Sequence, residues 1–133
     1  PGVVSIWDME KGKPVSNIFV DTDKSPIYAV LSPDGTKVAI SVKRTVRIHE
    51  SPTGILLGVH SEGLMSDNNS EVILGNEYFV VKDNSLTPPR EPARVRSVVR
   101  IKDMKVVKSI SLHEDYHITY PLASLTTIAA YKQ

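Results

Sequence analysis

The 133-residue sequence contains no cysteine. This absence excludes a disulfide framework, a thiol nucleophile and a thiolate metal site, and it fits a reducing compartment. No apolar run approaches the ~18–20 residues that cross a bilayer, and the first residues lack the basic-then-apolar layout of a secretory signal. We therefore expect a soluble intracellular protein, cytoplasmic or nuclear, with no membrane contact.

A large excess of charge of one sign is also missing, because sixteen basic residues face fifteen acidic ones and the net charge is +1. The chain thus gives no broad electrostatic reason to bind nucleic acid or an anionic surface. Its 41% hydrophobic and 23% charged residues lie in the range of globular proteins. The length is that of one domain, so residues 1–133 are expected to belong to a single folded unit.

Short runs with apolar residues at alternate positions dominate the sequence, which is typical of β-strands. Residues Lys37–Val42 and Thr45–His49 alternate in this way and are separated by two residues, as in a hairpin. The turn signal Ser32–Gly35 joins the first of them to Ile27–Leu31. The pattern predicts an all-β fold built from antiparallel meanders.

A weak internal repeat runs through the chain. The segment Val4–Asp8 matches Val46–Glu50 at a spacing of 42 residues, and Gly12 matches Gly54 at the same spacing. A third copy, Val99–Asp103, follows at a spacing of 53 residues. Repeats of ~40–45 residues with four short strands are typical of propeller blades. We expect blade-closing strands near residues 3–8, 45–50 and 98–103.

The residues Ile6-Trp7-Asp8 before a glycine turn, together with the Ser32–Gly35 hairpin, resemble the WD-repeat β-propeller family. Later copies replace Trp7-Asp8 with His49-Glu50 and Lys102-Asp103, so the repeats are degenerate. The resemblance implies blades of four-stranded antiparallel sheets. About three blades are present, and closed propellers have about 4–8. An incomplete ring is therefore predicted, from a fragment or from a protomer that assembles.

The sequence contains no recognisable motif for catalysis or cofactor binding. No Gly-x-Ser-x-Gly elbow and no glycine-rich phosphate loop occurs in the sequence. His113 and His117 are four residues apart, but on a strand such residues lie about 13 Å apart, too far to share one zinc ion. We predict no catalytic residues, no cofactor and no metal, and hence no enzyme activity within these residues.

Residues 86–96 form a proline- and arginine-rich insertion between two predicted strands. Its arginines, Arg90, Arg94 and Arg96, are the predicted binding residues, because guanidinium groups on a stiffened loop suit an acidic partner. RNA phosphates are a weaker alternative partner. The plainer interpretation is a solvated loop without a binding role.

The resemblance to WD repeats implies a non-catalytic scaffold that binds other proteins within a larger complex. A second hypothesis is that the chain is the propeller segment of a larger enzyme, such as a propeller-gated peptidase. A third hypothesis is a short-chain binding propeller that is assembled from several copies.

Overall fold

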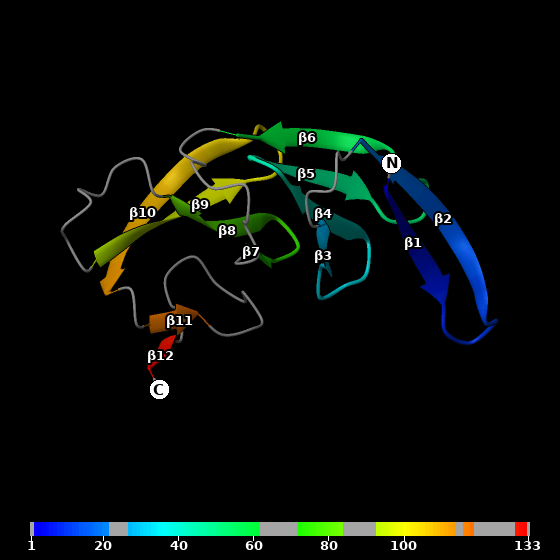
Figure 1. Ribbon diagram of the computed structural model, residues 1–133, viewed down its shortest axis with the longest axis horizontal. Helices are drawn as coiled ribbons and strands as arrows, with labels where there is room; N and C mark the ends of the chain where they lie inside the picture. The colour runs from blue at the N-terminus through cyan, green and yellow to red at the C-terminus, as the bar shows by residue number, and fades with distance from the viewer. Residues whose placement is uncertain are drawn as a thin grey trace.

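The computed structural model of the protein describes residues 2–21, 27–61, 72–83, 93–113, 116–118 and 130–132 (Figure 1). Within these ranges every regular element is a β-strand, and no described segment forms a helix long and apolar enough to cross a membrane. The strands are β1 (Gly2–Asp8), β2 (Lys13–Val20), β3 (Ile27–Leu31), β4 (Lys37–Val42), β5 (Thr45–Glu50), β6 (Leu56–His60), β7 (Val72–Leu74), β8 (Tyr78–Asp83), β9 (Ala93–Arg100), β10 (Lys105–His113), β11 (Tyr116–Ile118) and β12 (Ala130–Lys132).

The strands form two antiparallel sheets of four strands, with a sheet of two strands at each end of the chain. We call β3–β6 the first blade and β7–β10 the second blade; in both, each strand pairs with the next strand in the sequence. The two-stranded sheets are β1–β2 and β11–β12. The predicted all-β fold with four-stranded antiparallel sheets is confirmed, and the described strands do not close a ring (Figure 1).

The alternation of apolar residues gives each blade two apolar faces. In β4, Val38, Ile40 and Val42 project to one side and Ala39 projects to the other, because successive side chains of a strand point to opposite faces. All four are buried. A sheet with both faces apolar must be covered on both sides, so the first blade needs a neighbour on each face.

A hydrophobic core fills the interface between the first and second blades, where β7 lies against β3 and β4. The ring of Phe79 in β8 is fully buried there and meets the ring of His60 in β6 edge to face, with 5.9 Å between centroids. Burying a side chain of this kind stabilises a fold by about 1.5–3 kcal/mol. The buried members of this core are Ala39, Val46, Ile48, Val72, Leu74, Phe79, Val81, Val99 and Ile101.

A second core joins β1–β2 to the other face of the first blade. Ile18 and Val20 of β2 are buried against Val38, Ile40 and Val42 of β4. The hydroxyl of Ser16 also donates a hydrogen bond to the carbonyl of Ser51 across this interface, at 2.6 Å. The sheet β1–β2 and the two blades therefore form one continuous stack.

The repeat is visible in three equivalent hairpins, β1–β2, β5–β6 and β9–β10. In each, the last strand residue accepts a backbone hydrogen bond from a residue four positions later: Asp8 from Gly12, Glu50 from Gly54, and Arg100 from Met104. All three donors have a positive φ, between 57° and 76°. The same β-bulge also occurs in each hairpin, where Val15, Leu57 and Val107 are passed over in the pairing.

This equivalence corrects the predicted position of the third copy. Arg100 is the equivalent of Glu50, whereas the sequence had matched Asp103 to it, so the predicted position is three residues too far along the chain. The strand is β9, Ala93–Arg100, and residues 101–104 form the turn instead of the end of a strand. The error arose because Ile101 is buried although it lies in the turn, and its apolar side chain extends the alternation of β9.

Candidate binding cleft

Three turns come together at the edge between the first and second blades. The backbone N–H of Asp34, in the β3–β4 turn, donates to the side-chain oxygen of Asn76 in the β7–β8 turn, at 3.1 Å. The N–H of Ile101, in the β9–β10 turn, donates to the carbonyl of Glu77 at 2.9 Å. The hydrogen bond between Asp34 and Asn76 joins the two blades, and the one between Ile101 and Glu77 joins two turns of the second blade.

A cleft of about 460 Å³ lies at this junction. Its walls come from both blades, so its shape depends on how the blades stack. Three cationic side chains and one carboxylate line it together with apolar and amide groups. The lining residues are Lys37, Leu57, Asn76, Glu77, Tyr78, Arg100, Ile101 and Lys102.

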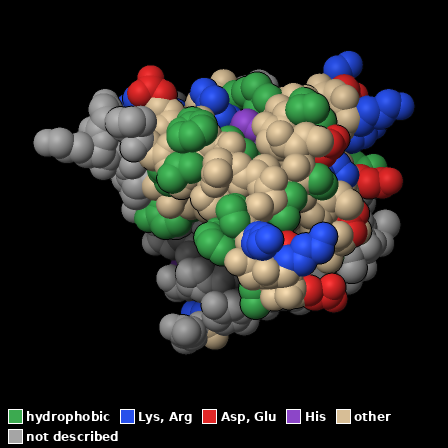
Figure 2. Space-filling view, turned by 90° about the vertical axis from the view of Figure 1, so that its right-hand side faces the viewer, with side chains coloured by type: hydrophobic (Ala, Val, Ile, Leu, Met, Phe, Trp, Pro, Cys, Tyr) green, Lys and Arg blue, Asp and Glu red, His purple; other side chains and the backbone are tan. Residues whose placement is uncertain are grey.

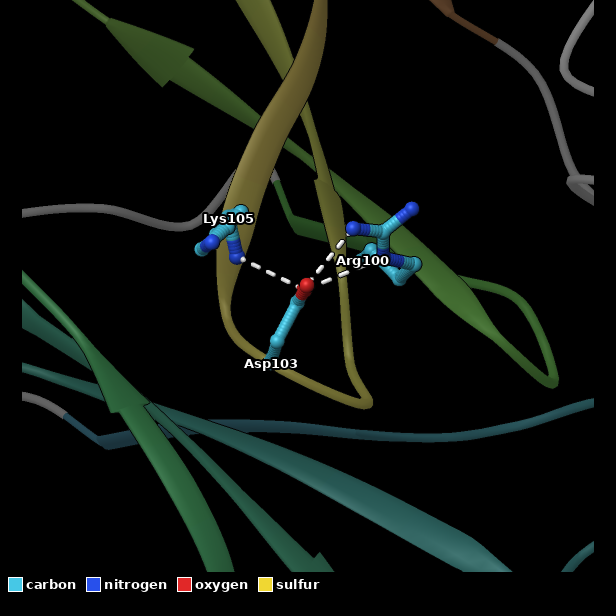
Figure 3. A network of polar contacts seen from close by, with 3 residues as sticks. All are labelled: Arg100, Asp103 and Lys105. Carbon is cyan, nitrogen blue, oxygen red and sulfur yellow. Dashed lines mark hydrogen bonds and ion pairs between the residues drawn. The ribbon is translucent and has the colours of Figure 1, made fainter.

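Arg100 is held in place by Asp103 in the turn that follows β9 (Figure 3). Its Nε and Nη2 donate to the two carboxylate oxygens of Asp103 at 3.0 and 2.6 Å, and the backbone N–H of Lys105 donates to Oδ1 at 3.3 Å. The hydrogen bonds from Arg100 lower the pKa of Asp103 to about 2, and Asp103 raises the pKa of Arg100. This bidentate geometry orients the guanidinium beside the cleft.

The β3–β4 turn has its own anchored carboxylate, Asp34. Its Oδ1 accepts hydrogen bonds from the backbone N–H and hydroxyl of Thr36, at 3.0 and 2.7 Å, and from the hydroxyl of Ser32 at 2.7 Å. These donors lower the pKa of Asp34 to about 2. Hydroxyl groups and a backbone amide thus stabilise the charged form of Asp34 within the turn that precedes Lys37, the first residue of β4.

The three predicted binding arginines do not share one described loop in the structure. Arg90 lies outside the described residues, and Arg94 belongs to β9, although its side chain is not described. Arg96 also belongs to β9, where its side chain is 1% exposed. The expectation that Arg96 lies on an accessible loop is therefore wrong, because the strand begins at Ala93 and turns this side chain into the sheet stack.

Among the described residues, no group of side chains that includes His113 or His117 is arranged to hold a metal ion. His113 ends β10, and His117 lies in β11 with its side chain outside the description. His49, which replaces Trp7 in the second copy of the repeat, is buried, and its Nδ1 donates to the carbonyl of Gly54 at 3.0 Å. His49 thus closes its own β5–β6 turn.

The sequence did not indicate the cleft, although one signal was present. Lys37, Glu77 and Arg100 each stand at or next to a strand end, where a turn brings charged residues to the surface. Which turns meet, however, depends on how the two blades stack against each other. The misplaced third copy of the repeat also put Arg100 inside a strand rather than at its end.

The fold defines an all-β class of protein: four-stranded antiparallel sheets stacked face to face as in propeller blades. No family model and no curated protein matches the sequence. Among solved structures, the chain is similar to part of hydrazine synthase from Kuenenia stuttgartiensis, with a TM-score of 0.56 and 16% identity. That protein contains a β-propeller. The similarity covers 89% of this chain and 34% of the other, so this chain spans about a third of its length. At this identity the similarity concerns the fold alone.

Proposed function

We propose that the protein is a non-catalytic interaction scaffold of WD-like repeats, and that the cleft between its blades binds an acidic segment of a protein partner. The resemblance of Ile6-Trp7-Asp8 and the Ser32–Gly35 hairpin to WD repeats supports the scaffold role. The Ser32–Gly35 turn lies in a four-stranded sheet with the layout of a blade, and Ile6-Trp7-Asp8 lies in the two-stranded sheet that packs against it. A rigid stack of this kind presents its turns at fixed positions, which favours recognition over chemistry.

The observation that carries the proposal is the composition of the cleft. Lys37 and Lys102 line it on opposite blades, with Arg100 oriented by Asp103. The exposed apolar surface of Leu57 lies beside these cations. An acidic side chain flanked by an apolar one would match this arrangement, because the cations attract the charge while the apolar walls exclude water from it.

The test is binding of a short fluorescein-labelled peptide of alternating glutamate and leucine, followed by fluorescence anisotropy. Charge reversal at both lysines, Lys37→Glu with Lys102→Glu, should weaken binding by about tenfold, since exposed charge pairs contribute about 0.2–1 kcal/mol each. Binding should also weaken with added salt, because the charges are close to solvent.

Lys11→Glu is the matched control, because Lys11 lies in the exposed β1–β2 turn and does not line the cleft. It changes the net charge by the same amount per residue. Equal weakening by Lys11→Glu, or no weakening by the double reversal, would refute the cleft as the docking site. Arg90→Ala with Arg94→Ala, in the same assay, tests the predicted insertion separately.

A further inference from the structure

The strands β2, β6 and β10 each have a free edge. Each is the second strand of one of the three equivalent hairpins, and among the described residues each pairs only with the strand before it. A free edge presents unpaired backbone N–H and C=O groups, with which a strand of another molecule can pair. Proteins commonly prevent such pairing by placing lysine or proline on the edge strand.

The strands β2 and β10 carry residues of this protective kind. β2 begins with Lys13 and Pro14, and β10 contains Lys105 and Lys108. A proline has no N–H to donate, and a lysine keeps its ammonium group in water. Figure 2, which faces the β1–β2 end of the stack, shows charged side chains interspersed with hydrophobic ones on the surface there. These two edges are therefore poorly suited to pairing with another strand.

The strand β6 contains neither lysine nor proline. Val59, for example, stands where β2 has Asn17 and β10 has Ser109. The β-bulge, which also protects edges, occurs in all three hairpins and so does not distinguish them. Of the three free edges, that of β6 is thus the one suited to pairing, and it carries a row of apolar residues that are 42–58% exposed: Ile55, Leu56, Leu57 and Val59.

This apolar row begins beside the cationic cleft. Leu57 belongs to β6 and also lines the cleft, together with Lys37 and Lys102. A segment that pairs with β6 would therefore have one end next to these two ammonium groups. Charge complementarity specifies an acidic residue at that end, and the apolar row specifies apolar residues along the rest of the segment.

We infer that the acidic partner segment binds as an extended strand along the free edge of β6, as a fifth strand of the four-stranded first blade. Its backbone would exchange hydrogen bonds with β6, its apolar side chains would pack on the exposed row, and an acidic side chain would enter the cleft. The inference rests on the proposed function, because it assigns the conformation in which the partner segment binds.

Backbone methylation of the labelled glutamate–leucine peptide tests this conformation. One peptide is N-methylated at its glutamates and the other at its leucines. Because successive N–H groups of a strand point to opposite edges, only one of the two peptides should lose its hydrogen bonds to β6. That peptide should bind the protein at least about tenfold more weakly, and the other should stay within about twofold of the unmethylated peptide.

The variant Val59→Asn tests the same edge from the side of the protein. Asparagine stands at the equivalent position of β2, so the backbone accommodates it, and the net charge does not change. Loss of the apolar contact should weaken peptide binding about fivefold. Val15→Asn is the matched control, because Val15 on β2 is 48% exposed and Val59 is 44% exposed. It should bind the peptide as the wild type does, and equal weakening by both variants would contradict the inference.

Hydrogen exchange separates this inference from the proposed function. With the peptide bound, the amides of β6 that point away from β5 should become protected. Binding that is lost on charge reversal at Lys37 and Lys102, but leaves these amides unprotected, would overturn the strand pairing and keep the cleft as the docking site. Absence of binding would overturn both. Protection of the same amides in the free protein that grows with its concentration would place a second copy on this edge and overturn the partner segment as its occupant.

Discussion

The two phenylalanines of the protein occupy opposite environments. Phe79 is fully buried between the first and second blades, whereas Phe19, on the outward face of β1–β2, is 78% exposed. Both lie in short apolar runs, Tyr78–Val81 and Ile18–Val20, but a neighbouring sheet covers only the face that carries Phe79. The comparison shows that the stability of this fold resides in the contacts between sheets, and that a blade without a neighbour exposes a core face.

The largest effect on stability is expected at Phe79, between the first and second blades. Phe79→Ala should lower the free energy of unfolding by about 3–5 kcal/mol, because it leaves a cavity in a packed core. Phe19→Ala should change it by less than about 0.5 kcal/mol, because Phe19 is largely exposed. Urea unfolding followed by circular dichroism measures both. Similar losses for the two variants would mean that the interface between the blades is not the main core.

A smaller effect is expected at the contact between β6 and the β9–β10 turn. A Cβ added at Gly58 would lie 2.5 Å from Cγ of Met104, so Gly58→Ala should cost about 1–3 kcal/mol through overpacking.

The double variant Gly58→Ala with Met104→Ala separates contact from backbone effects. If the two residues pack across the blades, adding Met104→Ala to Gly58→Ala should recover part of the lost free energy of unfolding. The double-mutant cycle should then show a coupling of about 0.5–3 kcal/mol between the two positions. Strictly additive unfolding energies would refute this packing. In the β1–β2 hairpin the equivalent of Gly58 is Ser16. Its hydroxyl donates a hydrogen bond to the carbonyl of Ser51, whereas Gly58 contacts the side chain of Met104.

The smallest effect concerns the loss of folding stability at acidic pH. The pKa of Asp34 is about 2, below its ordinary value of 3.8, so its charged form stabilises the folded state. This contribution is fully present above the unfolded pKa and is lost as the pH falls from about 4 to about 2. Asp34→Asn should therefore flatten the pH dependence of the unfolding midpoint in that window and leave its slope at neutral pH unchanged. An unaltered acid slope would show that the turn hydrogen bonds do not hold the charge.

Much of the fold could be predicted from local sequence. The alternation in residues 37–42 and 45–50 fixed β4 and β5, and Pro33 with Gly35, whose φ is +73°, predicted the turn before them. The third copy was displaced because Met104 stands where the other two turns have glycine. A non-glycine residue with φ +57° leaves no sequence signal for a turn.

The candidate site was much less predictable. Arginines in a proline-rich segment indicated a docking loop, but Ala93–Arg100 is a strand and Arg96 is buried in it. The cleft is assembled from turns that meet only when blades stack, as the hydrogen bond between Asp34 and Asn76 shows. Contacts between residues so far apart in the chain cannot be inferred from hydrophobic periodicity, which reports only which face of one strand is covered.

Amide hydrogen exchange of β1 compared with β5 tests most directly whether pairing and cover by a neighbouring sheet stabilise the strands of this fold. The two strands are equivalent, but β5 pairs on both sides and β1 on one. The amides of β1 that point away from β2 should exchange fast, whereas those of β5 should exchange slowly. Equal protection of the two strands would contradict the account.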